Sequence, residues 1–151
     1  MAKLEPMTAD TQATAIRIGN PASWKKALRV LRTTGGEVEQ VTELEIAEAK
    51  AEIGADGIGC EPASAVTLAG LKKLVRRGFV KQSETVVLIL TGHLLKDPDF
   101  TIKFHRGDLF PGTHDESQTA QIAPLQRAPA VLDADLAAVI AALDAAESRN
   151  S

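Results

Sequence analysis

Residues 85–90 read Thr85-Val86-Val87-Leu88-Ile89-Leu90 and are followed directly by Thr91-Gly92. After its first position the run is entirely apolar, and it is rich in β-branched side chains, which favour extended backbone. An unbroken apolar run, rather than an alternating one, is typical of a central parallel strand whose two faces are both covered. Residues 85–90 therefore predict such a strand, with Thr91 and Gly92 at its carboxyl end.

Two helical patterns stand at the beginning of the chain. In the first, we expect Asn20 to cap the helix, Pro21 to occupy its first position and Gly35 to end it. Apolar residues at helical spacing lie between these signals. In the second, Thr42 is followed three residues later by Glu45, which is the spacing of a capping box. Both segments are predicted to be helices.

Before residue 85, the predicted helices alternate with short segments of extended backbone. The second helix is expected to end at Gly54, and a third is expected over about 63–76, closed by Gly78. Short strands are expected at 15–18 and 38–41. Helices that alternate with strands in this way predict an α/β fold, a layered parallel sheet with flanking helices.

Beyond Pro98 the pattern changes. Residues 99–132 have mixed polarity and several prolines, and they predict an irregular tail. Asp133 is expected to cap a C-terminal helix over 133–147. The predicted organisation is thus a domain at 1–98, an irregular tail at 99–132 and a final helix.

Composition excludes several classes of protein. The chain has 151 residues and a net charge of −3, so it presents no basic field for a nucleic-acid backbone. It has five aromatic residues (four Phe, one Trp), too few for a base-stacking surface, and one cysteine, which excludes an internal disulfide. No apolar run reaches the roughly 18 residues that a membrane span requires. We expect a cytoplasmic protein with neither nucleic-acid nor membrane partners.

Thr91 and Gly92 are the first candidates for a binding site. Ligands of open α/β sheets bind beyond the carboxyl ends of the strands, where a hydroxyl and a glycine could face a ligand. The alternative is that Thr91 only ends the strand and Gly92 only turns the chain. Glu61 is a second candidate, because it precedes a helix that begins with small residues; alternatively it only favours the positive helix end. Ser64 has no adjacent His or Asp, so a nucleophilic serine is not expected.

Other reactive side chains point to no further chemistry. His93, His105 and His114 lack the pairing of a zinc site, so no metal is expected, and we expect His105 and His114 at the surface. Cys60 has an apolar context and is expected to be a small buried residue.

Three sequence blocks in order resemble the threonine synthase family. The resemblance covers about Thr11 to Pro98. The blocks are Thr14-Ala15-Ile16-Arg17-Ile18-Gly19-Asn20-Pro21 with Ser23-Trp24, Glu61-Pro62-Ala63-Ser64-Ala65 with Ala69-Gly70, and Leu90-Thr91-Gly92-His93 with Leu95-Lys96-Asp97-Pro98.

This resemblance implies part of a fold-type-II pyridoxal-phosphate enzyme, tryptophan-synthase-β-like in fold. It implies a carbon–oxygen lyase acting on phosphates, which converts O-phospho-L-homoserine and water to L-threonine and phosphate in threonine biosynthesis. By position, Thr91 would hydrogen-bond the pyridine nitrogen of pyridoxal 5'-phosphate, Gly92 would give the ring room, and Glu61 would lie near the ring.

The resemblance concerns only the C-terminal half of the family. The Schiff-base lysine and the glycine-rich phosphate loop precede this half, so no catalytic residue is assigned here and a complementary N-terminal half is the expected partner. Leu94 also replaces the family's usual glycine, which is expected to stiffen the turn. Self-association stays open. The alternative is a non-catalytic remnant that folds or binds a partner without turnover.

Overall fold

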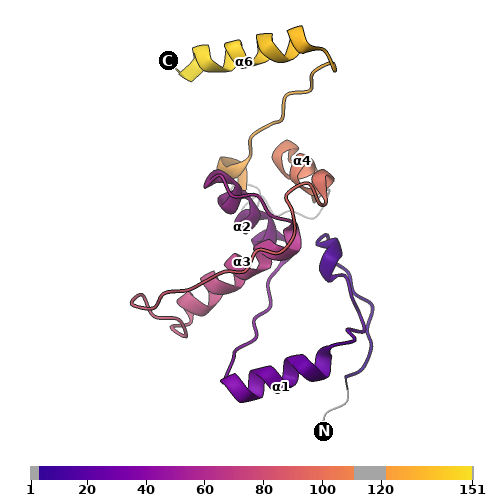
Figure 1. Cartoon of the computed structure of the whole chain (residues 1–151), viewed down its shortest axis with the longest axis vertical. Coiled ribbons are helices and arrows are strands. Elements are labelled where there is room, and N and C mark those ends of the chain that lie inside the picture. The colour runs from indigo at the N-terminus through magenta and orange to yellow at the C-terminus, as the bar shows by residue number, and fades with distance from the viewer. Residues whose placement is uncertain (1–3, 111–121, 151) are drawn as a thin grey trace.

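Helices α2 (Glu43–Ala55) and α3 (Pro62–Arg76) pack against each other at the centre of the computed structural model, which describes residues 4–110 and 122–150 (Figure 1). Both helices turn small or branched apolar side chains towards this contact, and that burial is the main stabilising term for amphipathic helices. The buried apolar residues of the two helices are Ile46, Ala47, Ala49, Ile53, Ala65 and Ala69.

The predicted start of α2 is confirmed, and its end is displaced. Thr42 accepts a hydrogen bond from the Glu45 backbone, and the Glu45 carboxylate accepts one from the Thr42 N–H, which completes the capping box. Gly54 lies inside the helix, which ends at Ala55, and it is Gly57 that takes the positive φ, at 77°. Helix α3 ends as predicted, with Gly78 at a φ of 72°.

The first residues after Pro98 are helical, where we predicted an irregular tail over 99–132. Helix α4 (Pro98–Arg106) buries Phe100 and Phe104, which lie one turn apart and face the core. Pro98 occupies the first turn, where its missing N–H costs no hydrogen bond, and Gly107 ends the helix at a φ of 83°. The start of the predicted irregular tail is thus a helix that begins at Pro98.

The N-terminal part contains η1 (Thr14–Ile16) and α1 (Trp24–Thr34), and Figure 1 shows α1 at the periphery. The predicted cap at Asn20 and Pro21 is wrong, because the helix begins three residues later, with Ser23 as its N-cap. The end is confirmed, since Gly35 takes the left-handed conformation at a φ of 66°.

The three predicted strands are absent from the part of the chain that the structure describes. Residues 15–18 form the end of η1 and a coil, and residues 38–41 and 85–90 are extended without a paired neighbour. Within 85–90, Val87 is 83% exposed and Ile89 is 72% exposed. A strand, unlike a helix, needs a neighbour for its backbone hydrogen bonds, so an apolar run alone does not form one. The layered sheet that we predicted is therefore not present here.

The C-terminal part comprises η2 (Ala123–Leu125), which contacts α2, and α6 (Leu136–Asn150), which Figure 1 shows apart from the other helices. A final helix was predicted, but Asp135 rather than Asp133 caps it: the Ala138 N–H donates to Asp135 Oδ2 at 3.0 Å. Across 4–110 and 122–150, no helix combines the length and the apolar character needed to traverse a bilayer.

Candidate functional site

Ser64, in the first turn of α3, joins this helix to the carboxyl end of the 85–90 run. Its side chain is buried, and its Oγ accepts hydrogen bonds from the Thr91 N–H at 3.0 Å and the Gly92 N–H at 3.2 Å. The Ser64 Oγ also lies 3.4 Å from Thr91 Oγ1. Thr91 as a whole residue is exposed, whereas Ser64 beneath it is buried.

The hydrogen bonds of Ser64 decide what Thr91 can donate. A serine hydroxyl has two acceptor positions and one proton. The two backbone N–H groups use both acceptor positions of Ser64, so its proton is left for Thr91 Oγ1. The proton of Thr91 is then free for an acceptor beyond the pair.

Glu61 lies directly against Gly92. Its N–H donates to the Gly92 carbonyl at 3.1 Å, and its side chain is buried although it makes no capping hydrogen bond to α3. A Cβ at position 92 would lie 2.0 Å from Glu61 Cδ, closer than any real contact. A side chain at position 92 would therefore force the carboxyl group of Glu61 to move.

The carboxylate of Glu61 is paired with Lys96. Glu61 Oε2 lies 2.8 Å from Lys96 Nζ, and the side chain of Lys96 is half-exposed. This close contact with the Glu61 carboxylate raises the pKa of Lys96 above its ordinary value. The buried carboxylate is thus compensated by a cation that reaches it from the solvent side.

The structure brings together the three predicted site residues, Glu61, Thr91 and Gly92. Sequence reasoning missed two others. Ser64 was considered only as a nucleophile, and Lys96 only as part of a sequence block. Their positions in the sequence were the available evidence: Ser64 stands in the same block as Glu61, and Lys96 stands in the same block as Thr91.

Other predictions near this site have clear outcomes. Cys60 is buried as expected, and burial raises the pKa of its thiol. Leu94 packs on Gly59, where an added Cβ would lie 2.6 Å from Leu94 Cβ. His105 is half-buried rather than at the surface, and His114 lies outside the described residues. Among the residues described, no three His, Cys, Asp or Glu side chains gather as a metal site would require.

Residues 2–92 match the family model of pyridoxal-phosphate dependent enzymes, and the chain belongs to this family. Pyridoxal phosphate is the cofactor of the family. A neutral hydroxyl on an exposed residue, Thr91, is chemically suited to a cofactor that carries a ring nitrogen as acceptor. The family's α/β class is the one predicted, although the described residues contain no sheet.

The curated relatives confirm the resemblance to threonine synthases. The chain is 54% identical over 94 residues to the threonine synthase of Methanosarcina acetivorans, which covers 62% of this chain and 23% of the relative. It is 50% identical over 95 residues to that of Methanocaldococcus jannaschii, covering 62% and 24%. It is 43% identical over 110 residues to the threonine synthase of Bacillus sp. ULM1, which covers 72% of this chain and 31% of the relative. The chain thus spans about a quarter to a third of the length of these relatives.

Proposed function

We propose that this chain supplies the pyridine-nitrogen side of a threonine synthase active site in the cytoplasm. The whole enzyme would convert O-phospho-L-homoserine and water to L-threonine and phosphate, as a carbon–oxygen lyase acting on phosphates. The proposal depends above all on one observation: the Ser64 Oγ accepts the Thr91 and Gly92 N–H groups and lies 3.4 Å from Thr91 Oγ1, which holds the Thr91 hydroxyl at the end of the 85–90 run.

In this proposal Thr91 donates a hydrogen bond to the ring nitrogen of pyridoxal phosphate. The cofactor, when bound, supplies an electron sink for carbanions formed on the substrate. A neutral hydroxyl partner does not force a proton onto the ring nitrogen, whereas a carboxylate partner would. Ser64 holds the Thr91 backbone in place, and the Glu61 carboxyl group, anchored by Lys96, lies beside Gly92 near the ring.

The proposal also assigns a partner to residues 85–90. We propose that these residues become a strand of a layered parallel sheet when a complementary N-terminal half, carrying the cofactor-binding lysine and the phosphate loop, is present. The high exposure of Val87 and Ile89 supports this, because such side chains are normally covered. Residues 2–92 belong to a family whose domain is α/β, which supports the same assignment.

The test is reconstitution. The chain is mixed with pyridoxal phosphate and with a polypeptide carrying the N-terminal part of the Methanosarcina acetivorans relative, and phosphate release from O-phospho-L-homoserine is measured. We expect release from the mixture and none from either part. Thr91→Val should lower the rate at least about tenfold, because it removes a hydrogen bond to the cofactor, whereas Thr91→Ser should retain most of it.

The alternative, a remnant that binds a partner without turnover, makes a different prediction for the same experiment. The exposed apolar side chains at positions 86, 87 and 89 favour association in either case. A stable complex of two folded parts that binds the cofactor but releases no phosphate would contradict the enzymatic proposal and support the remnant.

A further inference from the structure

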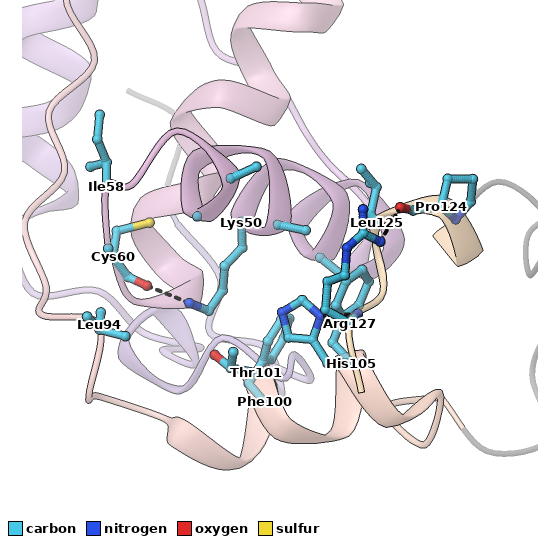
Figure 2. A pocket seen from close by; sticks show the side chains of 16 residues that line it. Lys50, Ile58, Cys60, Leu94, Phe100, Thr101, His105, Pro124, Leu125 and Arg127 are labelled. Carbon is cyan, nitrogen blue, oxygen red and sulfur yellow. Dashed lines mark hydrogen bonds between the residues drawn. The ribbon is translucent and has the colours of Figure 1, made fainter. Parts of the chain in front are cut away.

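A cavity of about 410 Å³ lies between α2, residues 58–60, α4 and η2, with Arg127 just after η2 also at its wall (Figure 2). Its volume is within the range of about 300–1,000 Å³ that small-molecule sites occupy. None of Glu61, Thr91 and Gly92 lines it, so it is distinct from the candidate cofactor site. Its walls are mainly apolar, with Phe100 and Phe104 from α4 and Leu125 from the segment opposite.

Four polar side chains line this cavity, and all of them are hydrogen-bond donors: Lys50, Thr101, His105 and Arg127. Among the described residues of the lining there is no Asp or Glu. Figure 2 shows Lys50 reaching from α2 towards the Cys60 carbonyl, to which its Nζ donates at 2.7 Å, with Thr101 and His105 pointing towards it from α4. No ion pair to Lys50 occurs within 4–110 and 122–150.

Thr101 and Lys50 have unused hydrogen-bonding capacity. Thr101 Oγ1 is buried and has no hydrogen-bond partner among the described residues. The Lys50 ammonium has three protons and uses one on Cys60. Burial lowers the pKa of Lys50, which is the expected response of a cation removed from water without a counter-charge.

His105 adds a third donor with a defined orientation. Its Nδ1 accepts the Arg127 N–H at 3.0 Å, so the proton of the neutral ring stands on Nε2. Burial lowers the pKa of His105, and the charges of Lys50 and Arg127 lower it further. The guanidinium of Arg127 donates to the carbonyls of Pro124 and Gln126, each at 2.8 Å, which fixes it at the cavity rim.

We propose that this cavity binds a small organic anion: a carboxylate with a short aliphatic body and no amino group. A carboxylate provides the acceptors that Lys50, Thr101 and His105 lack, and the apolar walls cover an aliphatic body. An amino group is excluded because its positive charge would lie among cations with no acidic side chain nearby. This anion site is separate from the proposed function. Either proposal can be refuted without affecting the other.

The first test compares matched probes on the full 151-residue chain by calorimetry and backbone-amide NMR. 3-Methylbutanoate is expected to bind and to shift the amide signals of Lys50, Thr101 and His105. 3-Methylbutanamide, which lacks the charge, and L-valine, which adds an amino group to the same skeleton, should each bind about tenfold or more weakly. Equal affinity for the amide or for valine, no binding of the carboxylate, or tighter binding of inorganic phosphate would overturn the proposal.

The second test uses variants of the lining. Lys50→Met keeps the aliphatic stem and should weaken 3-methylbutanoate binding about tenfold or more, whereas Lys81→Met, at an exposed position away from the cavity, should change nothing. Thr101→Val removes the unpartnered hydroxyl without changing the shape, so the fold should be retained and binding should weaken about two- to fivefold. If Lys50→Met changes the amide spectrum throughout the chain, the fold is disturbed and the Thr101→Val variant is used instead. Unchanged 3-methylbutanoate binding by Thr101→Val would contradict the proposal.

Discussion

The centre formed by α2, α3 and α4 and the run at 85–90 are both rich in apolar residues, yet only the first buries them. Ile46 is 3% exposed and Phe104 is 3% exposed, whereas Val87 is 83% exposed. A helix satisfies its own backbone hydrogen bonds and needs only one covered face, while a central strand needs neighbours on both edges and cover on both faces. The contrast indicates which parts of this chain are self-sufficient and which part requires a partner.

The largest change in the free energy of unfolding is expected from a substitution in the buried core of α2, α3 and α4. Phe104→Ala removes a fully buried ring from α4 and should lower the free energy of unfolding by about 3–5 kcal/mol. The matched change in the exposed run, Val87→Ala, should stay within about 0.5 kcal/mol in the isolated chain. Denaturant unfolding measures both, and similar losses for the two variants would show that the run is buried in solution.

A smaller effect is expected at the junction of the two regions. Ser64→Ala removes the acceptor that holds the Thr91 and Gly92 N–H groups, and it should cost about 1–3 kcal/mol of unfolding free energy. Ser83→Ala, at an exposed position, is the control. Hydrogen exchange should show the amides at 91 and 92 losing protection in the Ser64 variant only; unchanged protection would mean that Ser64 does not anchor this end of the run.

The contribution of local capping to helix stability can be tested at the N-caps of α1 and α2. Thr42→Ala should destabilise α2 by about 1 kcal/mol, because it removes half of the capping box. Ser23→Ala should have nearly no effect, since Ser23 makes no side-chain capping bond to α1. Thermal unfolding followed by circular dichroism separates the two, and an equal loss for both variants would contradict the assigned caps.

The smallest effect concerns pH. Burial alone would raise the pKa of Glu45, but hydrogen bonds from Lys73 and from the Thr42 backbone outweigh it, so the pKa lies below 4.5. A carboxylate with a lowered pKa contributes stability above its unfolded pKa and loses it as the pH falls through the folded value. Stability should therefore decline below about pH 4.5, by less than about 1 kcal/mol from this group.

Glu45→Gln should flatten that decline, and Glu5→Gln, at an exposed position without this network, should not. Urea unfolding at several pH values between 3 and 6 gives the comparison, with the pH values chosen about the ordinary carboxyl range. An identical pH profile for the Glu45 variant and the parent chain would remove the proposed role of this carboxylate.

Helix positions were predictable where capping residues and terminal glycines act locally. Thr42, Glu45, Gly35 and Gly78 have the roles that we predicted. Helix boundaries were predicted wrongly where one residue type fits two structures. Proline ends some helices and occupies the first turn of others, and Pro98 begins α4. The candidate site was predicted as three residues, and Ser64 was missed because its two backbone donors lie 27 and 28 positions along the chain.

The sequence by itself determined the membership of a cofactor-dependent family, the local starts and stops of helices, and the apolar character of residues 85–90. All of these depend on neighbouring residues or on ordered blocks. Only the tertiary structure decided that Glu61 lies against Gly92, that Ser64 accepts two backbone N–H groups, and that four donors share a cavity with no acid in its described lining. Such facts depend on contacts between distant segments, and no spacing along the chain encodes which polar group has its partners used.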